Sequence, residues 1–389
     1  MNSAVSSGFV PPQLHGASQP PSVGGEPLEY WGEESPLAGP ADLVSTRFPA
    51  ASLQESIMVP LDHYRVLCVV PGQRMPREQF EQRFRADQAA YGATGHSCAV
   101  ALDGILDAAP FIDLTARIAN LDHHKGVSRI NCPCSACQAM ELVSSGALDA
   151  LSDHGRRIMF IYAEDGDLDV VLGEWSLENA ELLRYKGVQE TVRPLFELED
   201  RLDRWCGASA ISPNERLVRQ MAWINEPFVQ AQRNPLFMHD AQGMARVICE
   251  ARDRVSAFVF GVAGEADLNT RYQLTPMVNG WGVLREYGYY ARALACSEGL
   301  DALLSVRGLG RQRVTYNLFR TSPQSPFPIE AAQAELNRRE AILCNGGGPR
   351  LWGGAKDMFT ASPRTGTLQT FEGILDIIRS VVGDGNKHS

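Results

Sequence analysis

The sequence has no uninterrupted apolar run of about 18 residues, the length that a membrane-spanning helix requires, so we expect no transmembrane helix. The first residues also lack a basic stretch followed by an apolar one, and so do not resemble a secretory signal. Basic residues are outnumbered, 36 against 46 acidic ones, which gives a formal net charge of −10. A broad basic surface for a long nucleic-acid duplex is therefore not expected, whereas a local pocket for a small anion remains open.

The cysteine count is nine, an odd number in a chain of 389 residues. Several of these cysteines, such as Cys68 and Cys98, lie inside apolar segments. We interpret them as reduced, buried side chains of a cytoplasmic protein. Apolar residues make up 44% of the chain, and the length allows two domains and a tail.

Periodicity predicts how the chain is organised. Residues 1–55 are rich in Pro, Gly and Ser and have little apolar periodicity, so we expect a disordered tail there. We predict a metal-bearing α/β domain over 56–175, a helical connector over 176–235 and a smaller α/β domain over 236–385 that serves the substrate. A homo-oligomer is compatible with this organisation.

Strands and helices alternate in the first predicted domain. Apolar runs that end at turn signals predict strands over 64–70, 97–102, 118–121 and 157–163. Helices are predicted over 76–92 and 135–145 and through most of 168–232, and a further strand is predicted over 255–261. The alternation indicates a parallel sheet with helices on both faces.

Acidic and imidazole side chains follow three of these strands. Asp103 follows the second strand, the triplet Asp122-His123-His124 follows the third, and Asp169 lies beyond the fourth, near Asp165 and Asp167. Ligands gather at the carboxyl ends of parallel strands. Such oxygen and nitrogen ligands suit Mn²⁺ or Mg²⁺, although zinc also fits, and a metal-activated water can attack a phosphoryl group. A single Asp at a strand end is more often a turn or helix-capping residue.

The run from Asn120 to His124 resembles the signature of the DHH phosphoesterase superfamily, whose members are metal-dependent enzymes that act on nucleic-acid ends, oligonucleotides, cyclic dinucleotides or polyphosphates. The resemblance implies that Asp103, His123 and Asp169 ligate the metal. It implies that Asp122 orients His123 and that His124 contacts the transferred group or acts as an acid.

The C-terminal region resembles the DHH-associated domain of the same family. Glycine clusters allow backbone N–H groups to approach an anion, and nearby basic side chains add charge. The substrate-binding residues implied by this resemblance are Gly346, Gly347, Gly348, Lys356 and Arg364.

The sequence departs from the family after its first strand. Members carry a His or Asp and two further Asp residues there, but residues 69–76 contain none of these and hold Arg74 instead. Half of a two-metal site is therefore missing. The guanidinium of Arg74 can replace the charge of a cation and hold a phosphate or carboxylate.

Three cysteines lie just beyond the triplet, at Cys132, Cys134 and Cys137. We weigh three interpretations: structural packing, a reactive thiol whose pKa is lowered at a helix N-terminus, and metal ligation.

These observations favour a metal-dependent phosphoesterase-like hydrolase that acts on a small phosphorylated or nucleotide substrate in a cleft between the two domains. The alternatives are a DHH-like protein that has lost catalysis and serves in ligand binding or interaction, and an enzyme of a specialised pathway with other metal chemistry.

Overall fold

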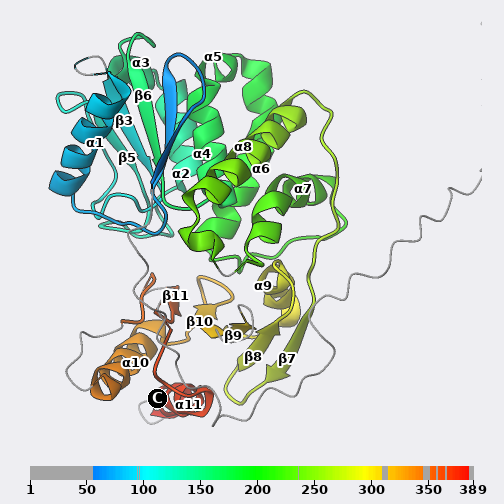
Figure 1. Cartoon of the computed structure of the whole chain (residues 1–389). Coiled ribbons are helices and arrows are strands. Elements are labelled where there is room, and N and C mark those ends of the chain that lie inside the picture. Colours follow the sequence, from blue (N-terminus) through cyan, green and yellow to red (C-terminus); the bar gives the residue numbers. More distant parts are fainter. Residues whose placement is uncertain are drawn as a thin grey trace, which may run out of the picture. The chain divides into compact units, whose positions relative to one another are not determined.

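The computed structural model describes residues 56–384 except 94, 96, 235, 309–313, 345–350, 356–357 and 364–365. The tail predicted over 1–55 lies outside the described residues. The described chain has two sheets and is a mixed α/β structure, so the predicted α/β class is confirmed (Figure 1). Within the described part of the chain, no helix has the length and apolar character needed to cross a membrane.

The first sheet has six strands in the order β1-β2-β6-β3-β5-β4. Its four central strands are parallel, and its two edge strands pair antiparallel with their neighbours. The strands are β1 (Ile57–Pro60), β2 (Arg65–Val69), β3 (Ser97–Leu102), β4 (Phe111–Asp113), β5 (Ile118–Leu121) and β6 (Ile158–Ala163). The four strands predicted in this region are thus confirmed, since each is an apolar run ended by turn residues.

Helices cover both faces of this sheet (Figure 1). On one face, α1 (Arg77–Tyr91) packs through Phe80 and Phe84, and the ring of Phe80 lies 4.9 Å from that of Tyr162. The other face is covered by α2 (Ser135–Ser144), α3 (Ala147–Ser152), α4 (Leu168–Glu178) and α8 (Ala241–Val259). The sheet is therefore buried on both sides, as parallel sheets generally are.

The connector is helical, as predicted. Its elements are α5 (Ala180–Leu183), α6 (Lys186–Arg204) and α7 (Arg216–Ala231), and the short 3₁₀ helix η1 (Phe237–His239) follows its predicted end.

The strand predicted over 255–261 is wrong, because this segment forms the last turns of α8 and the residues after it. Val247, Ala251, Val255 and Phe258 recur at helical spacing and form the buried face of α8. A window of seven apolar and small residues was too short to show this period. Because α8 packs in the core of the first sheet, the start of the second domain predicted at residue 236 falls within that core.

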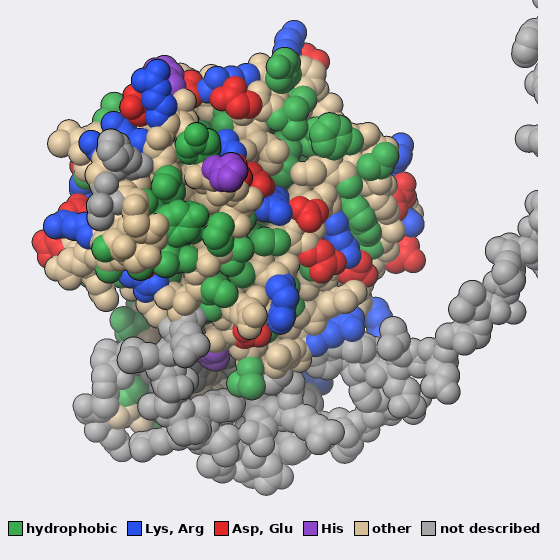
Figure 2. All heavy atoms as spheres, turned by 45° about the horizontal axis from the view of Figure 1, so that its top comes forward, with side chains coloured by type: hydrophobic (Ala, Val, Ile, Leu, Met, Phe, Trp, Pro, Cys, Tyr) green, Lys and Arg blue, Asp and Glu red, His purple; other side chains and the backbone are tan. Residues whose placement is uncertain are grey.

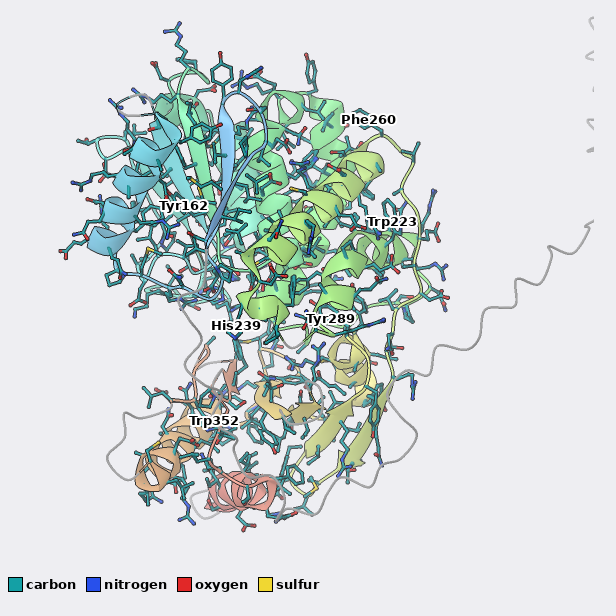
Figure 3. The ribbon with its side chains drawn as sticks, viewed as in Figure 1. Tyr162, Trp223, His239, Phe260, Tyr289 and Trp352 are labelled. Carbon is teal, nitrogen blue, oxygen red and sulfur yellow. The ribbon has the colours of Figure 1, made fainter. Side chains whose placement is uncertain are left out.

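The second sheet has the strand order β11-β10-β9-β8-β7, in which only β8 and β9 pair in parallel. Its strands are β7 (Tyr272–Pro276), β8 (Trp281–Glu286), β9 (Ala302–Gly308), β10 (Val314–Arg320) and β11 (Phe359–Ala361). Its helices are α9 (Ala291–Ala295), the 3₁₀ helix η2 (Cys296–Glu298), α10 (Ile329–Leu343) and α11 (Phe371–Asp384). Trp281, Leu304, Leu336 and Ile374 share one core, in which Trp352 is also buried (Figure 3).

Acidic, basic and apolar side chains are interspersed on the face of the protein shown in Figure 2.

The acidic side chain of Glu174, in α4, is fully buried against α8. Its carboxylate oxygens have no hydrogen-bond partner, and the nearest guanidinium atom of Arg252 lies 3.8 Å away. Burial first, and then the charge of Glu178, raises the pKa of Glu174 from 4.5 to about 8.

This burial predicts a pH-dependent stability. The folded protein keeps the Glu174 proton up to about pH 8, whereas the unfolded chain releases it near 4.5, so the stabilising contribution of this group is lost as the pH rises between these values. We expect the free energy of unfolding of the native chain to fall over this pH range. The decrease should exceed that of Glu174→Gln by on the order of 1–3 kcal/mol. Denaturant unfolding at several pH values measures the difference. Glu181→Gln, at a side chain that is 75% exposed, is the control; equal slopes in native chain and Glu174→Gln would contradict the prediction.

Candidate metal centre

The candidate site lies where β3 and β5 end. Asp103 directly follows β3, and Asp122, His123 and His124 directly follow β5. The two strands are parallel neighbours, so their carboxyl ends lie at the same edge of the sheet. Asp103, Asp122 and His123 are buried, whereas the His124 side chain is 24% exposed.

Asp122 holds the loop that carries the two histidines. Its Oδ1 accepts hydrogen bonds from the backbone N–H groups of His123 and His124, at 2.7 and 2.9 Å. The same oxygen lies 2.8 Å from Nδ1 of His124. From the sequence, we expected Asp122 to orient the ring of His123. In the structure, the Asp122 carboxylate contacts the ring of His124 instead.

His124 also lies against Asp103, with 3.1 Å between Nδ1 and Oδ1. Burial by itself lowers the pKa of His124, but the charges and hydrogen bonds of Asp103 and Asp122 raise it to about 10. Burial likewise opposes the ionisation of Asp103, yet His124 and then His123 hold its pKa below the usual range. His124 and Asp103 thus favour each other's charged forms.

His123 lies at the centre of two groups of candidate ligands. It shares one group with Asp103 and His124 and the other with Asp169 and Asp203, and the ligand atoms within each group lie within 4.8 Å of one another. Its Nε2 is 2.9 Å from Oδ2 of Asp203 and 3.5 Å from Oδ1 of Asp103. The geometry of both contacts of Nε2 falls short of a hydrogen bond, and Oδ1 of Asp103 also lies 3.1 Å from Nδ1 of His124. Both carboxylate oxygens thus lie near one buried ring nitrogen.

Asp169 is fully buried in the first turn of α4. Its two carboxylate oxygens accept hydrogen bonds from the backbone N–H groups of Ser135 and Ala136, at 2.9 and 2.8 Å. These N–H groups belong to the first turn of α2, where they have no partner within the helix. Burial, followed by the charges of Asp203 and Asp103, raises the pKa of Asp169 to about 7. The carboxylate predicted as a ligand thus caps a helix.

Asp203 was not predicted from the sequence. It lies in the last turn of α6, and Nη2 of Arg129 contacts its Oδ1 at 2.7 Å. Burial opposes its ionisation, but the charges of Arg129 and His123 keep its pKa below the usual range. One signal was present in the sequence: Asp203 follows the buried Leu195 and Phe196 by eight and seven residues, so it lies on the apolar stripe of the helix.

Asp165 and Asp167 bring further acidic groups to the cluster, since both lie within 4.8 Å of Asp103. Asp167 caps α4 by accepting a hydrogen bond from the N–H of Val170 at 3.1 Å, which is the capping role expected of a single Asp at such a position. Burial and the charge of Asp165 raise the pKa of Asp167. Carboxylates are thus crowded together in a buried region.

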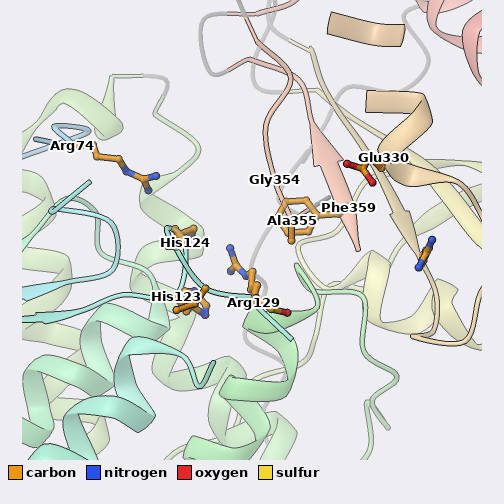
Figure 4. A pocket seen from close by; sticks show the side chains of 11 residues that line it. Arg74, His123, His124, Arg129, Glu330, Gly354, Ala355 and Phe359 are labelled. Carbon is orange, nitrogen blue, oxygen red and sulfur yellow. The ribbon is translucent and has the colours of Figure 1, made fainter. Parts of the chain in front are cut away.

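A cavity of about 590 Å³ adjoins this cluster (Figure 4). Arg74, His124 and Arg129 line it from loops that follow strands of the first sheet, and Glu330 of α10 and Phe359 of β11 line it from the second sheet and its helices. Its described lining residues are Arg74, His123, His124, Val127, Ser128, Arg129, Arg320, Glu330, Gly354, Ala355 and Phe359. Among these, Glu330 is the one acidic side chain, so the wall is suited to an anion.

Two of the arginines are fixed in the wall by contacts of their own. Nε of Arg74 donates to the carbonyl oxygen of Gly104 at 2.9 Å, and its Nη2 lies 3.9 Å from Glu164. The guanidinium carbon of Arg129 lies 5.5 Å from the centre of the Phe359 ring. The sequence-based hypothesis placed Arg74 near a missing metal motif, and the structure places it beside His124 in the cavity wall.

The cysteines do not form a single cluster. Cys134 and Cys137 lie near Asp200, whereas the sulfur of Cys132 lies 3.8 Å from the carbonyl oxygen of Asp122. Burial raises the pKa of both Cys132 and Cys134. This favours structural packing for these two cysteines, and the reactive thiol stays a prediction. Asp200 already accepts a hydrogen bond from the N–H of Cys134.

The predicted substrate-binding residues Gly346, Gly347, Gly348, Lys356 and Arg364 lie outside the described residues.

A scan against protein-family models finds no matching family, and a search of curated proteins finds no match to the chain.

Gly354 is the glycine of the cavity wall whose conformation and space both require it. Its φ is +136°, and a Cβ added there would lie 2.6 Å from the carbonyl oxygen of Phe359. We expect Gly354→Ala to lower the free energy of unfolding by about 1–3 kcal/mol. Gly353→Ala is the matched control, because a Cβ there meets nothing within 4 Å. Denaturant unfolding compares the two variants, and equal stabilities would disprove the expected strain.

Proposed function

We propose that this protein is a DHH-like, metal-dependent phosphoesterase that hydrolyses a small phosphorylated or nucleotide substrate in the cavity beside His124. One observation carries the proposal. Buried carboxylate and imidazole atoms without hydrogen-bond partners adjoin a cavity whose wall holds three arginines. The first feature suits a cation, and the second suits an anionic substrate. The resemblance of residues 120–124 to the DHH signature supports the same reaction class.

The donor set fits a divalent cation. Nε2 of His123 lies 2.9 Å from Oδ2 of Asp203 and 3.5 Å from Oδ1 of Asp103, and all three atoms are buried. Buried charges cost several kcal/mol each, and a cation bound here would add to the compensation that Arg129 and His124 already give these carboxylates. Oxygen and imidazole ligands of this kind suit Mn²⁺ or Mg²⁺. When bound, such an ion activates water and neutralises charge on a phosphoryl group.

The side chains of the cavity bind and orient the substrate. Arg74, Arg129 and Arg320 offer guanidinium groups, whose planar fork matches two phosphate oxygens. His124 is the partly exposed histidine of the pair, so it is the one that reaches a substrate in the cavity, where it donates a hydrogen bond to the phosphoryl group or to the leaving oxygen. His123, fully buried, faces the carboxylates instead.

A second candidate function is ligand binding without hydrolysis. One observation favours it: a guanidinium, that of Arg74, faces the cavity after β2, where DHH enzymes carry further metal-binding side chains. A cation at this position would then be replaced by a fixed positive charge, which binds an anion but does not activate water.

Hydrolysis tests the choice between the two functions. With Mn²⁺ or Mg²⁺, the purified protein is expected to release nitrophenol from bis(p-nitrophenyl) phosphate or p-nitrophenyl phosphate, and a chelator is expected to abolish the reaction. Asp103→Asn should lower the rate by roughly 100-fold or more, because it removes a proposed ligand. Asp107→Asn, at a side chain that is 40% exposed and paired with Lys125, is the control. Binding of phosphate without turnover under any cation would overturn the enzyme proposal and favour the second candidate.

Arg74 has a separate test. We expect Arg74→Ala to weaken the binding of inorganic phosphate by about tenfold, since a charge-assisted hydrogen bond contributes about 1.5–3 kcal/mol. Isothermal titration with phosphate measures the loss. Arg85→Ala, whose side chain on α1 is 70% exposed, provides the control. Unchanged affinity in Arg74→Ala would remove this residue from the substrate site.

A further inference from the structure

We propose that Asp203 of the connector helix is a ligand of the metal, together with Asp103 and His123, and that Asp169 positions the site without binding the ion. The inference rests on the proposed metal-dependent function. It concerns a residue that the resemblance to the DHH family does not assign, and it moves one ligand role from α4 to α6.

The two oxygens of Asp203 have different surroundings. Oδ1 accepts a hydrogen bond from Nη2 of Arg129 at 2.7 Å, and the same nitrogen donates to the backbone carbonyl oxygen of Asp203 at 3.0 Å. These two contacts fix the orientation of the carboxylate. Its other oxygen, Oδ2, is left facing Nε2 of His123 at 2.9 Å, and it is buried without a hydrogen-bond partner. Arg129 thus holds one oxygen and presents the other to the site.

A proton on His123 does not account for this arrangement as well as a cation does. Nε2 of His123 lies near both Oδ2 of Asp203 and Oδ1 of Asp103, at 2.9 and 3.5 Å, and none of these atoms has hydrogen-bond geometry toward another. A single N–H can be directed at only one of the two oxygens. A cation can contact the nitrogen and both oxygens together, because metal coordination joins several ligand atoms at one point.

Asp169 is occupied differently. Both of its oxygens accept hydrogen bonds from the start of α2, from Ser135 and Ala136. The hydroxyl of Ser135 in turn accepts a hydrogen bond from the backbone N–H of Asp103 at 3.2 Å. Asp169 therefore fixes α2, and α2 contacts the backbone of a proposed ligand. This is a positioning role, because the carboxylate binds N–H groups that have no partner within the helix.

Titration of the full chain with Mn²⁺ alone, after treatment with a chelator, separates these roles. We expect Asp203→Asn and Asp103→Asn each to weaken Mn²⁺ binding by at least about tenfold, a loss that even the outer partners of metal ligands typically cause. Asp169→Asn is expected to lower the unfolding temperature of the metal-free protein while weakening Mn²⁺ binding less than Asp203→Asn does. Glu197→Gln, at an exposed position of the same helix α6, is the matched control.

A crystal of the native chain soaked in Mn²⁺ gives a second measurement that does not depend on how the variants fold. The anomalous signal of the ion is expected within roughly 2–2.5 Å of Oδ2 of Asp203, an ordinary distance for a metal–oxygen contact.

The outcomes distinguish this inference from the proposed function. If Asp203→Asn binds Mn²⁺ like the native chain while Asp103→Asn does not, Asp203 is only an ion-pair partner of His123, and the inference is overturned although the metal site stands. An ion in contact with Asp169 and distant from Asp203 would overturn it in the same way. If the native chain binds no Mn²⁺, the inference and the metal-dependent function fail together.

Discussion

The crowding of carboxylates at the ends of β3 and β5 is the constraint on which the rest of the site depends. Asp103, Asp169 and Asp203 lie around a buried histidine, and Asp103 and Asp169 are themselves buried, so water screens their charges poorly. Two neighbouring cations compensate part of this charge: Arg129 is held against Asp203, and His124 against Asp103. Burial, and then the charges of Asp203 and Asp103, raises the pKa of Asp169 to about 7. A cation bound in such a cluster would stabilise it further.

The first turn of α2 joins the parts of this cluster. It begins next to the cysteine-rich loop, and its backbone N–H groups bind Asp169 from α4, while the N–H of Cys134 binds Asp200 from α6 at 2.8 Å. Free N–H groups at a helix start carry partial positive charge and favour carboxylates. Three helices are thus tied together by backbone groups that any sequence could supply, and the carboxylates that they bind are what make the arrangement specific.

Local signals in the sequence were sufficient for the four parallel strands of the first sheet, but the short edge strands β1 and β4 were not predicted. The strands at 97–102 and 118–121 are short apolar runs that end at Asp-Gly and Asp-His, and both a run and its stop signal lie within a few residues. The same local signals led to a wrong strand at 255–261. The residues that show the helical period of α8 lie before this segment in the sequence. The alternation of elements predicted a parallel sheet in general, and the structure shows that β3 and β5 are parallel neighbours in it, which brings Asp103 to the histidine pair.

Local signals of this kind could not predict contacts between segments that are distant in the sequence. Asp203 lies 80 residues after His123 in a helix whose buried side is otherwise apolar, and only the packing of α6 reveals which way that stripe faces. The role of Asp169 as a helix cap could not be predicted either, because its hydrogen-bond partners are backbone N–H groups, which nearly every residue has.

Arg74 shows how the cavity and the cluster depend on each other. Its Nε is bonded to the carbonyl oxygen of Gly104, the residue after Asp103, so the guanidinium is tied to the loop that carries a proposed ligand. Gly104 has φ +86°, and a Cβ there would lie 2.4 Å from Nη2 of Arg74. The loop therefore needs glycine both for its backbone conformation and to admit the arginine. An anion bound by Arg74 and a cation bound by Asp103 would then lie on either side of one short turn. Arg74 lies on the loop after β2 and Asp103 on the loop after β3, and the hydrogen bond from Arg74 to Gly104 joins the two loops. Binding of an anion at Arg74 would therefore be coupled to binding of a cation at Asp103.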